Sequence, residues 1–76
     1  SIVKLSSGKV AVVFEKCETN LLTPKVKAFF SIKNNVRIKP ELIDLSKPNV
    51  KDKIESHESD LDFSFQNISD LLSYDD

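Results

Sequence analysis

Several residue types on which protein chemistry depends are scarce in this sequence. It contains one cysteine, Cys17, so no disulfide can form within the chain and no cluster of thiolates can bind a metal. Its one glycine, Gly8, is too few for a glycine-rich phosphate-binding loop and is explained by a turn. Its one histidine, His57, is the only imidazole that could act as a general base. These shortages argue against catalysis by this chain alone.

The reactive groups that remain do not form a convincing site. Neighbouring side chains on a strand alternate between faces, so His57 and the acids around it are a poor set of metal ligands, and we expect an exposed histidine. Cys17 has no activating base near it in the sequence, and we expect a thiol in a loop or partly buried. Asp60 and Asp62 have no evident apolar pocket that would make one of them a general acid. We therefore predict no catalytic residue, metal site or cofactor.

Long apolar runs and methionine are also missing. The longest uninterrupted apolar run, residues 10–14, is much too short to cross a membrane, and no basic leader precedes a hydrophobic stretch. With 76 residues and a single cysteine, the chain is expected to form one small domain that is soluble and cytoplasmic. It has no methionine, even at position 1, so we expect a piece of a longer polypeptide.

The charge is unevenly distributed along the chain. Residues 1–53 hold all eleven Lys and Arg side chains and five acids, a balance of +6, whereas residues 54–76 hold seven acids and no base. One interpretation is that the two parts attract each other within one fold and keep it soluble. The other is that one part binds a partner.

Alternating apolar residues predict a protein built mainly of strands. Residues 2–5 and 10–15 form a first hairpin over a Ser-Gly turn, and residues 25–33 and 36–39 form a second one over Asn34-Asn35. Residues 17–24 are expected to form a loop. Further elements are a short strand or helical turn over 41–45 and a last strand over 53–59. We predict a small antiparallel five-stranded sheet or a partly open SH3-like barrel, with a short C-terminal helix.

The tail differs in period from the rest of the chain. We therefore divide the chain into a small β domain, residues 1–59, and an acidic tail, residues 60–76, in which Asn67 can cap a short amphipathic helix. A helix this short needs a surface to pack on, and we expect the tail to dock on the β domain. The candidate docking residues are Phe63, Phe65, Ile68, Leu71 and Leu72.

The strand over 25–33 has apolar side chains on both predicted faces. Val26, Ala28, Phe30 and Ile32 face one way, while Phe29 faces the other among basic residues. This second face would be covered by the tail or by a neighbouring domain, or would bind single-stranded nucleic acid by stacking on Phe29. The candidate contact surface consists of Phe29, Lys25, Lys27, Lys33, Arg37 and Lys39.

Three stretches occur in a distinctive order: VKLSSGKVAVV at 3–13, LTPKVK at 22–27 and IDLS at 43–46. This arrangement resembles the segment that follows the catalytic domain in many bacterial HD-GYP proteins. That segment has a strand, a Leu-Ser-X-Gly turn, a run of valines, a loop ending in Arg-Pro or Thr-Pro, another strand and an Asp-Leu-Ser. The resemblance covers roughly residues 2–57.

The resemblance implies a parent protein that hydrolyses the bacterial second messenger cyclic di-GMP at an iron or manganese centre. The His-Asp pair and the Gly-Tyr-Pro triplet of the catalytic domain are absent, so no catalytic or metal-binding residue is carried over. We expect a non-catalytic accessory or regulatory domain whose partner is the neighbouring hydrolase domain in the same polypeptide. The alternative is a small β-barrel module that binds nucleic acid or protein, although nucleic acid is not the expected partner. The oligomeric state stays open.

Overall fold

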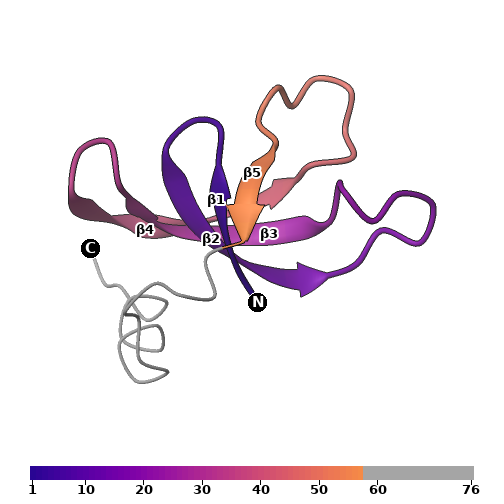
Figure 1. Cartoon of the computed structure of the whole chain (residues 1–76), viewed down its shortest axis with the longest axis horizontal. Helices are drawn as coiled ribbons and strands as arrows, with labels where there is room; N and C mark the ends of the chain where they lie inside the picture. Colours follow the sequence, from indigo (N-terminus) through magenta and orange to yellow (C-terminus); the bar gives the residue numbers. More distant parts are fainter. Residues whose placement is uncertain (58–76) are drawn as a thin grey trace.

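The computed structural model describes residues 1–57, which form one antiparallel sheet of five strands (Figure 1). The strands are β1 (Ile2–Leu5), β2 (Lys9–Glu15), β3 (Lys25–Ser31), β4 (Val36–Asp44) and β5 (Ile54–His57). Their order across the sheet is β4-β3-β2-β1-β5, so β4 and β5 are the edges. The predicted five-stranded antiparallel sheet is confirmed. The predicted C-terminal helix, the boundary after residue 59 and the docking residues of the tail lie outside the described residues.

The first hairpin forms as the turn chemistry predicts. Gly8 adopts a φ of 87°, a conformation that side chains disfavour, and its N–H donates to the carbonyl of Leu5 at 2.9 Å. A Cβ atom placed on Gly8 would lie 3.1 Å from the Cβ of Lys33, which belongs to the turn between β3 and β4. The carbonyl of Gly8 accepts a hydrogen bond from the N–H of Ile32 at 2.8 Å, so the two turns pack against each other.

The second hairpin differs from its predicted form at both ends of the turn. Strand β3 ends at Ser31, because the hydroxyl of Ser31 accepts a hydrogen bond from the N–H of Asn34 at 3.1 Å and starts the turn there. The turn takes four residues, 32–35, and Asn35 carries the positive φ, 53°. Ile32 was predicted to continue the strand on the same face as Val26 and Ala28, but it lies within this turn and its side chain is 40% exposed.

Strand β4 continues through a proline. Ala28 lies opposite Glu41 and Phe30 lies opposite Arg37, so β4 has two more residues than β3 over this interval. The interval contains Pro40, which has no N–H to donate, and an irregular edge strand accommodates it. The alternatives for residues 41–45 are thereby resolved: residues through Asp44 extend the strand.

Apolar side chains pack on both faces of the sheet. On one face the buried residues are Val3, Leu5, Ala11, Val26, Ala28 and Leu45, with Val13, Ile38, Ile43, Val50 and Ile54 packed against them. A second cluster contains the buried residues Val10 and Phe29, with Ile2, Val12 and Phe30 partly buried around them. The two-faced apolar character expected for this sheet is confirmed. No helix within residues 1–57 has the length and apolar character needed to cross a membrane.

A β-bulge corrects the predicted faces of β3. Val10 lies opposite Phe30 whereas Ala11 lies opposite Ala28, so Phe29 is an extra residue in β3 relative to β2. Beyond the bulge the alternation is reversed, and Phe30 packs with Phe29 instead of with Ala28. Phe29 lies on the face opposite Val26, as predicted, and it is fully buried. Burial of Phe29 agrees with the expectation that this second face is covered rather than open to solvent.

Candidate interaction surface

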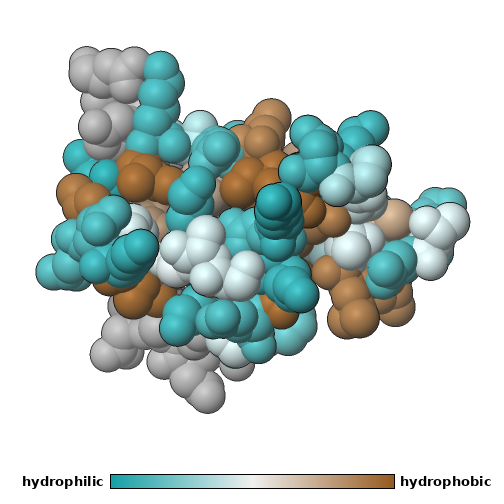
Figure 2. Space-filling view, turned by 90° about the horizontal axis from the view of Figure 1, so that it is seen from above, coloured by the Kyte–Doolittle hydropathy of each residue, from teal (hydrophilic) through white to brown (hydrophobic). Residues whose placement is uncertain are grey.

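Two adjacent leucines are the most exposed large apolar side chains among the described residues. Leu21 and Leu22 lie in the loop 16–24 between β2 and β3 and are 74% and 75% exposed. In the space-filling view, hydrophobic surface projects from the end of the molecule where this loop lies (Figure 2). Neither leucine belongs to a core cluster. They therefore contribute little to the packing of this sheet.

Local hydrogen bonds hold the loop in one turn. The side-chain oxygen of Asn20 accepts a hydrogen bond from the N–H of Leu22 at 2.9 Å, and its carbonyl accepts one from the N–H of Thr23 at 3.2 Å. The next residue, Pro24, is buried, and its carbonyl accepts a hydrogen bond from the N–H of Leu45 at 3.2 Å. The leucines are thus presented by a turn whose end is anchored on the core.

The loop and the edge strand β5 enclose an open cleft. Its volume is about 470 Å³, and a second hollow of about 200 Å³ adjoins it, sharing Leu21, Ile54 and His57. The larger cleft is lined by Asn20, Leu21, Leu22, Thr23, Lys53, Ile54, Glu55, Ser56 and His57. Ile54 is partly buried and packs on the main core, so the cleft has an apolar floor.

Charged groups flank this apolar floor. Lys53 lines the larger hollow and Lys16 the smaller one. Glu55 also lines the larger hollow, but its carboxylate is 3.8 Å from the ammonium of Lys4. His57 is exposed, as predicted. The basic groups that remain available at the two hollows make the cleft suited to an apolar segment that carries carboxylates.

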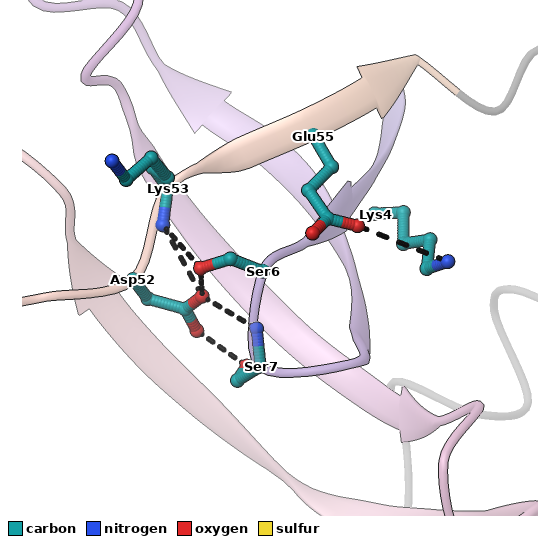
Figure 3. Close-up of polar contacts among 6 residues, drawn as sticks. All are labelled: Lys4, Ser6, Ser7, Asp52, Lys53 and Glu55. Carbon is teal, nitrogen blue, oxygen red and sulfur yellow. Dashed lines mark hydrogen bonds and ion pairs between the residues drawn. The ribbon is translucent and has the colours of Figure 1, made fainter.

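A polar cluster at one end of β5 fixes the position of this strand, which forms the second wall of the cleft (Figure 3). The carboxylate of Asp52 accepts hydrogen bonds from the hydroxyl of Ser6 at 2.8 Å and from the N–H of Ser7 at 2.9 Å, and also from the hydroxyl of Ser7. The N–H of Ser6 donates to the carbonyl of Lys53 at 2.8 Å. These contacts tie the connection before β5 to the first hairpin turn, so they determine where the edge strand begins.

The predicted basic and aromatic contact surface is only partly assembled. Lys25 is exposed and pairs with Glu15 at 2.9 Å, a contact that raises the pKa of Lys25. Lys27 is partly buried in β3, Lys33 lies in the following turn, and Arg37 and Lys39 are exposed on β4. Phe29 is fully buried in this structure and therefore offers no exposed ring on which a base could stack.

Of the groups considered for catalysis, Cys17 and His57 belong to the residues that the structure describes, whereas Asp60 and Asp62 lie outside them. Cys17 is a free, partly buried thiol in the loop 16–24, as predicted, with its sulfur 3.3 Å from the hydroxyl of Thr19. Hydrogen bonds from the side chain and backbone of Thr19 lower the pKa of this thiol. No group of three or more His, Cys, Asp or Glu side chains within residues 1–57 is arranged to hold a metal ion.

Leu21 and Leu22 were overlooked at the level of sequence. Asn20 and Pro24 predict a loop over residues 17–24, but turn chemistry alone assigns no role to the apolar pair between them. The signal was nevertheless present, because adjacent leucines inside a stretch with turn chemistry have few neighbours of their own to bury them.

The fold and the cleft define a small antiparallel β domain with an exposed apolar loop. No family model matches the chain, and no solved structure gives a significant match. The chain is 35% identical, over 71 residues, to the cyclic di-GMP phosphodiesterase PA4108 of Pseudomonas aeruginosa. The match covers 93% of this chain but only 17% of the length of that protein. The resemblance to a segment of such proteins, predicted from the sequence, is confirmed.

Proposed function

We propose that this chain is a non-catalytic accessory segment of an HD-GYP-type cyclic di-GMP phosphodiesterase and packs on or positions the hydrolase domain of the same polypeptide. Hydrolysis, and the metal ions that the HD-GYP resemblance implies, are assigned to that neighbouring domain. The protein would then take part in cytoplasmic signalling through the second messenger.

One observation carries this proposal: nearly the whole chain matches a relative named as a cyclic di-GMP phosphodiesterase, yet it spans a small fraction of that relative. A match of this extent is expected when one folded unit is shared and the rest of the relative does something else. The described residues support the same division, because they form a sheet with its own core.

The mechanism follows from linkage. A packed accessory domain changes the activity of its neighbour only if the free energy of docking differs between the active and inactive arrangements of the hydrolase. A domain that docks equally well on both arrangements would stabilise the protein without regulating it. Regulation therefore requires a docking surface that is complete in one arrangement and incomplete in the other.

The proposal is tested in two stages. An antibody raised against these 76 residues should detect a polypeptide several times heavier than the 8.6 kDa of this chain in source cells. The purified natural polypeptide should then hydrolyse cyclic di-GMP, and removal of this segment should change the rate or the stability of the hydrolase. A band at 8.6 kDa, or a large polypeptide without hydrolase activity, would contradict the proposal.

A further inference from the structure

We infer that the cleft between loop 16–24 and β5 is the docking site for the hydrolase domain, and that its occupant is an extended segment carrying apolar side chains flanked by carboxylates. This inference rests on the proposed function and names the surface and the chemistry of the contact. The surface differs from the predicted basic and aromatic one.

Exposed apolar area held in a fixed turn is the first argument. Leu21 and Leu22 stay about three-quarters exposed although the hydrogen bonds of Asn20 and the buried Pro24 hold the loop in place. A turn that already presents its apolar side chains loses little conformational entropy when it binds, so it favours association. The sheet gains no packing from this arrangement, which is therefore suited to a partner.

The second argument compares the two edges of the sheet. Edge strand β4 contains Pro40 and an irregular register, and Glu41 on it is bound to Lys9 at 2.9 Å; these are features that hinder the addition of another strand. Edge strand β5 has no proline, and no strand among residues 1–57 pairs with the side opposite β1. An extended segment can therefore add to β5 and place its apolar side chains against Leu21 and Ile54.

The third argument is charge. The described residues hold eleven basic side chains and six acids. Lys16 and Lys53 line the two hollows and take part in none of the ion pairs between described residues, whereas Glu55 is paired with Lys4. Carboxylates on the incoming segment would thus meet ammonium groups at the cleft, which selects an acidic occupant over a basic one.

Amide hydrogen exchange tests the assignment residue by residue. The complete natural polypeptide is compared with the isolated 76-residue chain, and exchange at residues 20–23 and 53–57 should be slower in the complete polypeptide by about tenfold or more. The double substitution Leu21→Ser and Leu22→Ser should abolish this difference. Leu42→Ser is the matched control, since Leu42 is 65% exposed on the opposite edge strand and should leave the protection intact.

A substitution of a charged residue tests the same docking site without changing the leucines. Lys53→Glu in the complete polypeptide should reduce the protection at the cleft, whereas Lys47→Glu, on an exposed lysine that lines neither hollow, should not. Thermal unfolding of each isolated variant chain checks that the sheet is retained. If both charge variants reduce the protection equally, the proposed pairing of Lys53 with carboxylates of the incoming segment is wrong.

The outcomes separate this inference from the proposed function. Protection that appears in the complete polypeptide on another surface, such as β3 and β4, would overturn the cleft assignment and leave the accessory role standing. Equal exchange everywhere, with unchanged hydrolysis when the segment is removed, would contradict both. If the cleft residues are already protected in the isolated chain, the occupant is not the hydrolase domain. Protection that rises with protein concentration would assign the cleft to a second copy of the chain. Protection that is independent of concentration would assign it to the chain itself.

Discussion

The two longest connections between strands of the sheet contain nine residues each. Apolar residues of one pack on the core, whereas the two leucines of the other are exposed. In the connection 45–53, Leu45 is 5% exposed and Val50 packs on the core. In the connection 16–24, Leu21 and Leu22 face outward, and local hydrogen bonds hold the turn. The first connection stabilises the sheet, whereas the second presents a surface. Substitutions in the two connections should therefore separate stability from association.

The largest expected effect is on the inward-facing connection. Leu45→Ala should lower the free energy of unfolding by about 2 to 5 kcal/mol, because it removes buried methyl groups and leaves a cavity. Leu21→Ala should change it by less than about 0.5 kcal/mol, since that side chain is mostly exposed. Urea unfolding of the two variants measures the contrast. Equal destabilisation would show that both connections serve the core.

The next largest effect concerns the polar contact that closes the connection 45–53. Asp52→Ala should cost about 1 to 3 kcal/mol, because the hydrogen-bond donors of Ser6 and Ser7 lose their shared acceptor. Asn20→Ala, which removes one local acceptor in the other connection, should cost about 0.5 to 1.5 kcal/mol. Chemical denaturation at neutral pH ranks the two variants. The reverse ranking would contradict the assigned roles.

Acid should weaken the same contact. Burial raises the pKa of Asp52, but hydrogen bonds from Ser7, Ser6 and the backbone of Lys53 outweigh it and leave the pKa below its ordinary value. Stability from such a carboxylate is fully present above the unfolded pKa of about 3.9 and is lost as pH falls through the folded value. Melting temperatures should therefore fall more steeply below about pH 4 in the wild type than in Asp52→Asn.

A second carboxylate, Asp44, also makes the melting temperature depend on pH. Hydrogen bonds from the hydroxyl and backbone of Ser46 lower the pKa of Asp44, which lies just before the connection 45–53. Some acid sensitivity should therefore remain in the Asp52→Asn variant. If Asp52→Asn retains the full slope of the wild type, the contact with Ser6 and Ser7 makes no contribution that depends on pH.

The smallest expected effect on stability belongs to the outward-facing connection. In the isolated chain, replacing both Leu21 and Leu22 with serine should leave the melting temperature almost unchanged. Both side chains are already about three-quarters exposed in the folded state, so their replacement removes little buried apolar area. Calorimetry of the isolated chain gives this value. A loss of several degrees would mean that the leucines support the sheet, and their proposed role in docking would then lose its main support.

Alternating polarity was enough to predict the strands but not the irregular positions within them. The hairpins follow from Gly8, Asn35 and a period of two, which are local properties. The bulge at Phe29 adds one residue to β3, and a strict period of two cannot anticipate where such a residue is inserted. For this reason Phe30 was predicted to share a face with Ala28, whereas it packs with Phe29.

The candidate site was harder to predict because it depends on contacts between distant residues. Asp52 and Ser7 are 45 positions apart in the sequence, and no local pattern pairs them. The cleft joins the loop 16–24 with β5, which become neighbours only after the sheet has formed. Composition could identify Leu21 and Leu22 as apolar loop residues, but only the fold determines that they remain exposed beside an edge strand.

The arrangement of β1 and β5 has a mechanical consequence. These strands are antiparallel neighbours, with Val3 opposite His57 and Leu5 opposite Ile54, so the chain enters and leaves the sheet at the same end. Tension applied at residues 1 and 57 would load the hydrogen bonds between β1 and β5 one after another. The reason is that hydrogen bonds of an antiparallel pair lie across the strands, so pulling from this end separates them in sequence. The contact between Asp52 and Ser7, at the far end, would be loaded last. Single-molecule pulling should therefore record unzipping at low force, with a late step that Asp52→Ala removes.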